Sequence, residues 1–223
     1  MVDFLICTIG IPLSRDTDSW SFIKIPLAKA ERLGSVKAAI SDSAFLSSLY
    51  ETLKAWGIGT RASRLSPPEV FAASLRNCRV AIEALDEVTI NDANVSEVSD
   101  ELWQLLTNLE VVDNEAKLVS GSKALHHLLP ELVVPIDRAY TQRFFGWQNP
   151  VFQYRQRQCF REAFSAFAEI ARSVGPENFV GTGWRSSRTK IIDNALIGML
   201  MSKKSEITRY GSIVRVNHEL LTF

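Results

Sequence analysis

The sequence predicts an all-α protein, and three observations support this fold class. Several long segments carry apolar residues three and four positions apart, as one buried face of a helix requires. Residues that favour helix starts, such as Ser, Asp and Pro, precede these segments, and glycines follow them. Segments with the spacing of strands are short, and residues 4–11 and 212–216 are too few to define a sheet.

The N-terminal half contains two clear helical segments. Residues 43–56 place large apolar side chains on one face, and Gly57 follows where a left-handed residue commonly ends a helix. The second helix is expected from Ser66, with a proline in its first turn and Glu69 completing a capping box. Its apolar face continues to residue 85.

A polar and acidic segment, residues 87–98, is expected to form a hinge. Ser99 then has the side chain expected of an N-cap, before a helix with four leucines on its inner face. We therefore expect two helical lobes, residues 1–98 and residues 99–223, or one integrated domain that contains both.

The C-terminal half is expected to contain four further helices. They cover residues 122–129, a segment that opens near Asp137, residues 151–174 and residues 187–201. Gly175 and Pro176 end the longest of these helices, because a proline cannot continue the hydrogen-bond pattern.

The composition excludes several classes of protein. Hydrophobic residues make up 46% of the chain and charged residues 22%, which is the balance of a globular protein. No apolar run approaches the ~20 residues that span a bilayer, and Asp3 stands where a secretory signal carries positive charge. The three cysteines are widely separated, which argues against disulfides and cysteine metal clusters. We expect a soluble, cytoplasmic monomer of bacterial type.

The net charge of +0 conceals an asymmetry between the two halves of the chain. Residues 1–112 contain 10 Lys and Arg against 15 Asp and Glu, whereas residues 113–223 contain 15 against 10. The halves therefore carry −5 and +5. A basic half is typical of a protein that binds a polyanion through one face.

Two turns in residues 118–140 carry the most informative pattern. The expected glycine turn Ser120-Gly121-Ser122 leads to Lys123 at the start of a helix. The turn Val134-Pro135-Ile136 leads in the same way to Asp137. Two such turns can bring an amine and a carboxylate into one cleft.

In these turns the sequence resembles the helix-hairpin-helix DNA glycosylase superfamily, which includes proteins similar to 8-oxoguanine glycosylase and endonuclease III. In that superfamily a Gly-x-Lys-x-Ala-like turn and a Pro-Val-Asp-like turn hold the catalytic lysine and aspartate, and Lys123 and Asp137 occupy those positions. The sequence lacks the iron–sulfur cysteines of some members and is therefore similar to the cluster-free branch. The resemblance implies a two-lobe fold, double-stranded DNA as the partner, and a monovalent cation at the hairpin as the only cofactor.

The implied reaction explains both residue types. Cleavage of an N-glycosidic bond builds positive charge on the sugar, and an ionised Asp137 stabilises that charge in a site with little water. Lys123 can attack the sugar and form a Schiff base if its pKa falls towards neutrality, which also permits strand scission. Alternatively, Asp137 activates water in a monofunctional enzyme. Considered singly, such an Asp is usually an N-cap and such a Lys is usually solvated.

Arginines and aromatic residues are interleaved after Asp137. Five arginines and no acidic residue occur between Asp137 and Glu162. Arginine pairs with phosphates, and aromatic rings stack on extruded bases, although most of these rings are also suited to the core. The expected DNA contacts are Ser120, Gly121, Ser122, Arg138, Arg143, Arg61 and Arg64 in the loop 57–64, and Arg185; the expected base pocket contains Tyr140 and Trp147.

His126 and His127 have no third ligand at metal spacing, so we expect no transition metal and interpret the pair as part of the core or of a helix surface. The predicted function is that of a DNA glycosylase that flips a modified base and cleaves its glycosidic bond, with possible AP-lyase activity. The base is either an oxidised or damaged one, in DNA repair, or a phage modification, in antiviral defence. The alternatives are a non-catalytic helix-hairpin-helix DNA-binding module and a helical interaction protein.

Overall fold

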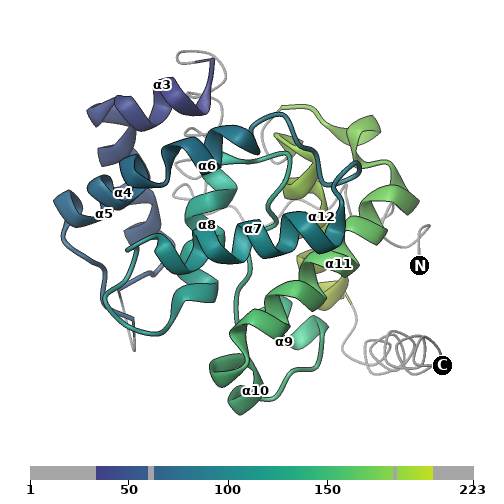
Figure 1. Cartoon of the computed structure of the whole chain (residues 1–223). Coiled ribbons are helices and arrows are strands. Elements are labelled where there is room, and N and C mark those ends of the chain that lie inside the picture. The colour runs from purple at the N-terminus through teal and green to yellow at the C-terminus, as the bar shows by residue number, and fades with distance from the viewer. Residues whose placement is uncertain (1–33, 60–62, 183–184, 203–223) are drawn as a thin grey trace.

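The computed structural model describes residues 34–59, 63–182 and 185–202, and helices dominate this part of the chain (Figure 1). The described elements are α3 (Val36–Ser41), α4 (Ser43–Ala55), α5 (Pro68–Asn77), α6 (Arg79–Ala84), α7 (Val95–Asn108), α8 (Lys117–Leu128), α9 (Thr141–Phe144), α10 (Asn149–Tyr154), α11 (Gln156–Val174), the 3-10 helix η2 (Pro176–Phe179) and α12 (Arg188–Ser202). The residues described form one isolated β-bridge, between Leu65 and Val112, and no strand. The all-α class is confirmed. The two segments considered for strands lie outside the described residues.

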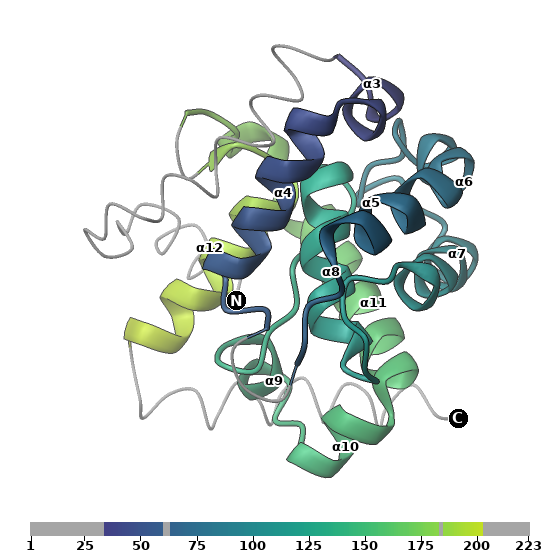
Figure 2. The same ribbon diagram turned by 90° about the vertical axis from the view of Figure 1, so that its left-hand side faces the viewer.

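Helix α8 occupies the centre of the fold (Figure 2). Helices α4, α7 and α11 all contact it, and most of its residues are buried. A helix surrounded by other helices is expected to be buried on nearly every side. The central position of α8 therefore decides which of its side chains meet which neighbour.

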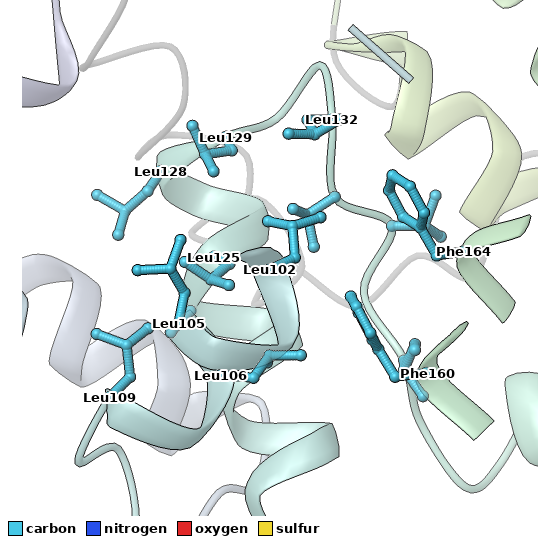
Figure 3. Close-up of a cluster of buried hydrophobic side chains, with 14 of the residues drawn as sticks. Leu102, Leu105, Leu106, Leu109, Leu125, Leu128, Leu129, Leu132, Phe160 and Phe164 are labelled. Atoms are coloured by element: carbon cyan, nitrogen blue, oxygen red, sulfur yellow. The ribbon is translucent and has the colours of Figure 1, made fainter. Parts of the chain in front are cut away.

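The main core lies between α7, α8 and α11 (Figure 3). Leucines of α7 and α8 interdigitate there and face two phenylalanines of α11. The same continuous cluster of buried side chains includes Leu53 of α4 and Phe71 of α5, which precede residue 98. The division into lobes at residue 98 stays a prediction. None of the helices described is long and apolar enough to cross a membrane.

The glycine turn expected at residues 120–122 is wrong. Ser120, Gly121 and Ser122 lie inside α8 and are buried, so they cannot offer an exposed hairpin to DNA or to a monovalent cation. A Cβ atom at Gly121 would clash with Cδ2 of Leu106 in α7. The glycine is needed here for the close approach of two helices, not for a turn.

Two expected helix starts are also wrong. Helix α5 begins at Pro68, and its N-cap is Pro67, which has no side-chain acceptor. The backbone N–H of Ser66 donates to the Val111 carbonyl (3.1 Å) beside the β-bridge. Helix α7 begins earlier than expected, after Asn94, and Ser99 lies within it. Neither serine therefore occupies an N-cap position.

The helix expected over residues 151–174 is divided into α10 and α11 at Arg155. At this break the side chain of Gln156 accepts a hydrogen bond from the Leu118 N–H (2.8 Å), one of the first-turn donors that α8 cannot satisfy itself. The same side chain donates to the Glu115 carbonyl (2.6 Å). As expected, Gly175 ends α11 with a left-handed backbone (φ 62°).

The contact at Gly121 predicts the stability of a Gly121→Ala variant. Added volume in a close-packed core typically costs about 1–3 kcal/mol, more than the ~1 kcal/mol by which Ala favours a helix over Gly. We expect Gly121→Ala to lower the free energy of unfolding in urea titrations. In a Leu106→Ala background the same change should cost less, because the clash with Cδ2 is gone and only the backbone contacts at 3.3 Å and 3.4 Å remain. A destabilisation of equal size in both backgrounds would contradict this explanation.

Candidate functional site

Two lysines from different helices converge on the ring of Trp56, the C-cap residue that follows α4. The Lys123 ammonium of α8 donates to the Trp56 carbonyl oxygen (3.4 Å) and lies 5.2 Å from the centre of the ring. The Lys190 ammonium of α12 lies 6.0 Å from the same ring centre. Because the face of an indole attracts cations, Trp56 favours both positions.

Asp193 neutralises one of these lysines directly. Its carboxylate accepts a hydrogen bond from the Lys190 ammonium at 2.6 Å, within the first turns of α12. The side chains of Lys190 and Asp193 are only 15% and 13% exposed. The ion pair is therefore largely shielded from water, and Asp193 is the carboxylate that balances the charge of Lys190.

The turn before α9 holds Asp137 in a fixed orientation. Its Oδ1 atom accepts hydrogen bonds from the backbone N–H groups of Tyr140 (2.7 Å) and Thr141 (3.2 Å), and its own N–H donates to the Thr141 hydroxyl (3.2 Å). The preceding N–H, of Ile136, donates to the Ser122 hydroxyl of α8 (3.0 Å). Ser122 therefore ties the Asp137 turn to the helix that carries Lys123.

Burial and neighbouring charges move the pKa values of Lys123 and Asp137 towards each other. Burial lowers the pKa of the Lys123 amine; Asp137 and Asp193 oppose this lowering, and Lys190 adds to it. Burial raises the pKa of Asp137, against the hydrogen bond from Tyr140; Asp193 raises it further, and Lys123 opposes the rise. The site thus contains an amine that loses its proton more readily than usual and a carboxylate that gains one more readily.

His126 and His127 lie beside Trp56 as two buried, neutral rings. Their rings lie 6.3 Å and 4.8 Å from that of Trp56, and both side chains are buried. Burial lowers the pKa of His126 to about 3 and that of His127 well below its usual value. His126 contacts the Val133 carbonyl through Nδ1 (2.8 Å). Among the residues described, no group of three or more His, Cys, Asp or Glu side chains is arranged to hold a metal ion.

The structure brings Lys123 and Asp137 into one cluster, as the sequence predicted. Gly121 instead serves helix packing, and Ser120 and Ser122 make hydrogen bonds inside the protein. Lys190 and Asp193 were missed. Their local signal was a pair of opposite charges three residues apart, Lys190 and Asp193, in a segment whose buried positions are mostly apolar. Charges on such a helix indicate a partner inside the protein, and that partner, Trp56, lies more than 130 residues earlier in the chain.

The predicted DNA-binding arginines lie in several places. Arg138 is exposed just before α9, a helix that contacts α12, and Arg143 is exposed within it. The Arg138 guanidinium lies 5.6 Å from the Phe152 ring. Arg64 is exposed and pairs with Asp113 (3.2 Å). Arg185 is exposed beside Gly181, before α12. Arg61 lies outside the described residues.

The two residues of the expected base pocket are both partly buried. Trp147 stacks on Phe145 with ring centres 4.4 Å apart, and its indole N–H donates to Glu162 (3.1 Å). These contacts hold the ring in place, and its assignment to the base pocket stays a prediction. Tyr140 is partly buried next to Asp137, and its role there stays a prediction.

Comparison with family models, curated proteins and solved structures gave no match for this chain. The chemistry of the cluster must therefore carry the functional argument.

The charges around Lys123 predict opposite responses to two substitutions. Lys190→Met removes a cation and should raise the pKa of Lys123, whereas Asp193→Asn removes an anion and should lower it. Only the neutral amine is methylated by formaldehyde and borohydride. The pH at which Lys123 becomes half-labelled, followed by mass spectrometry of its peptide, should move up in Lys190→Met and down in Asp193→Asn.

Labelling of the exposed Lys37 on α3 gives an internal reference for this measurement. Shifts of the same sign in both variants, or identical curves for both, would show that the four charges are not coupled through this cluster.

Proposed function

We propose that the chain is a DNA glycosylase whose reaction is carried out by Lys123 and Asp137. The observation that carries the proposal is a half-buried amine and a half-buried carboxylate that interact electrostatically and whose pKa values are shifted towards each other. Such shifts occur where groups exchange protons or attack a substrate, although structural ion pairs also produce them. Here the direct ion pair is made by Lys190 and Asp193, which leaves Lys123 without a carboxylate within 4.0 Å among the residues described.

The steps of the reaction follow from these two groups. Neutral Lys123 attacks the anomeric carbon of the sugar while the bond to the base nitrogen breaks, and the electron pair of that bond leaves with the base. Asp137, as the carboxylate, stabilises the positive charge on the sugar and accepts a proton from the attacking amine. Ring opening then gives a Schiff base between Lys123 and the sugar. If water replaces the amine as the nucleophile, Asp137 takes the proton of that water instead.

The surroundings of the pair support this chemistry. The neutral rings of His126 and His127, together with Trp56, exclude water from one side of Lys123, which strengthens electrostatic interactions in the site. The exposed arginines Arg138 and Arg143 lie next to the Asp137 turn, where phosphates of a bound duplex need cations. The modified base, whether damaged or of phage origin, would enter beside Tyr140.

The non-catalytic alternative is weaker on the same observations. The burial of residues 120–122 within α8 removes the hairpin phosphate contacts from both functions. A hairpin module would depend on those contacts alone, whereas the enzyme would still bind DNA through Arg138 and Arg143. The module also gives no reason to bury a lysine and an aspartate, since burial of charged groups is unfavourable. We therefore retain the enzyme as the proposal.

Borohydride trapping on duplexes with damaged or phage-type bases tests the reaction. We expect a covalent protein–DNA adduct with the wild type and none with Lys123→Ala. Asp137→Asn should lower excision by about 10²–10⁴-fold, the usual effect of removing a general acid–base group. Adduct formation should rise with pH up to neutrality, because a protonated amine is not a nucleophile and a protonated Asp137 stabilises no cation.

Lys54→Ala is the matched control, because Lys54 is an exposed lysine on α4 two residues before Trp56 and pairs with Glu51. Its adduct yield should equal that of the wild type. Excision without an adduct, but dependent on Asp137, identifies a monofunctional enzyme. If all variants leave every substrate intact, the glycosylase proposal fails.

Duplex binding tests the assignment of Arg138 and Arg143. Each phosphate contact contributes roughly 0.9 to the slope of log affinity against log salt, so the Arg138→Gln, Arg143→Gln double variant should lower that slope by about 2. Arg76→Gln on α5 changes an exposed arginine away from the site and should leave the slope unchanged. An equal loss in both variants would indicate that the chain binds DNA only through its general charge.

A further inference from the structure

A groove lies on another face of the molecule, along the exposed sides of α7 and α11. It has a volume of about 850 Å³ and extends from Trp103 and Thr107 on α7 to Tyr154 and Arg157 near the start of α11. Lys117, the first residue of α8, also lines it. This volume is within the range of about 300–1,000 Å³ that is usual for ligand sites.

The charge of the groove favours an anionic occupant. Four cationic residues line it, Lys117, Arg155, Arg157 and Arg161, against two carboxylates, Glu115 and Glu162. Glu162 is already engaged with the indole N–H of Trp147.

The arginines of the groove are only weakly held. Arg157 and Arg161 lie 3.4 Å from the same carboxylate, that of Asp100, and their side chains are 53% and 47% exposed. One carboxylate cannot neutralise two guanidinium groups, and exposed pairs of this kind contribute little. Arg155 has no ion pair with any carboxylate of the described residues. All three can therefore bind phosphates at little cost.

Tyr154 indicates which kind of anion the groove binds. Its side chain is 78% exposed, more than that of any other large hydrophobic residue described, and it lines the groove beside Arg155. An exposed aromatic ring next to arginines provides a surface on which an unpaired base can stack. An acidic peptide would need the cations but not the ring.

The floor of the groove is fixed before any ligand binds. The Gln156 side chain links the starts of α11 and α8 through the Leu118 N–H and the Glu115 carbonyl. The rings of Trp103 and Phe160 lie 6.0 Å apart and hold α7 against α11 below the surface. A ligand in the groove therefore does not have to order these elements.

From this arrangement we propose that the groove binds a single-stranded segment of nucleic acid, with phosphates at Arg157 and Arg161 and a base stacked on Tyr154. This inference does not depend on the glycosylase activity, because the groove contains neither Lys123 nor Asp137.

Fluorescence anisotropy with a labelled 12-nucleotide oligo(dT) tests the proposal on the full chain. Tyr154→Ala should weaken binding roughly tenfold, the effect expected for loss of one stacked base, whereas Tyr154→Phe, which keeps the ring, should bind as the wild type does. The Arg157→Gln, Arg161→Gln double variant should lower the salt slope by about 1.4. Arg76→Gln on α5 is the control for charge and should bind normally.

Several outcomes would overturn the proposal. These are oligo(dT) binding that Tyr154→Ala leaves unchanged, an equal loss in Arg76→Gln, and no binding by the wild type at low salt. Polyglutamate that displaces the oligonucleotide at equal charge concentration would identify the groove as a surface for acidic peptides. A duplex that binds more tightly than oligo(dT), with the same dependence on Tyr154, would exclude a single strand. None of these outcomes affects the trapping assay, so the two proposals fail separately.

Discussion

The close contact between α7 and α8 at Gly121 determines how the rest of the structure is arranged. Because residue 121 has no side chain, α8 can approach the buried Leu106 and lie at the centre of the fold. Residues two positions apart on a helix point in roughly opposite directions, about 200° apart. With Gly121 towards α7, Lys123 is directed to the far side of α8, where Trp56 and α12 lie. One glycine thus sets the position of the candidate nucleophile.

Burial of the charged groups around Trp56 lowers the stability of the folded protein. Charged groups lose their hydration when they are buried, and a half-buried pair recovers only part of that loss. The structure reduces the loss through the Lys190–Asp193 contact, through the backbone donors at Asp137 and through the indole ring beside both ammonium groups. Apolar residues at these positions would pack against the same neighbours without this cost. A cluster of this kind is therefore better explained by chemistry than by stability.

Much of the helical framework could be predicted from periodicity, because an amphipathic segment such as α4 carries its signal locally. The association of Lys123 with Asp137 was also predictable, since the two residues lie close together in the sequence on either side of a proline-rich break, although residues 120–122 form no turn. The role of Gly121 was not, because a glycine needed for helix packing looks the same in a sequence as one needed for a turn. The convergence of Lys123 and Lys190 on Trp56 depends on contacts between distant segments, which leave no local pattern.

The candidate active site and the groove lie on different sides of α8, and the chain itself connects them. Lys117 lies four residues before Gly121, so it shares the α7 side of the helix, whereas Lys123 faces α12. From Asp137 the chain passes through α9 and α10 to the start of α11, which borders the groove. Arg138, Arg143 and Arg155 are exposed along this path. A nucleic acid that occupied both sites would have to follow this edge, and a rigid, straight duplex is poorly suited to such a course. Local strand separation would suit it better, because a single strand bends easily and leaves one base free for each site.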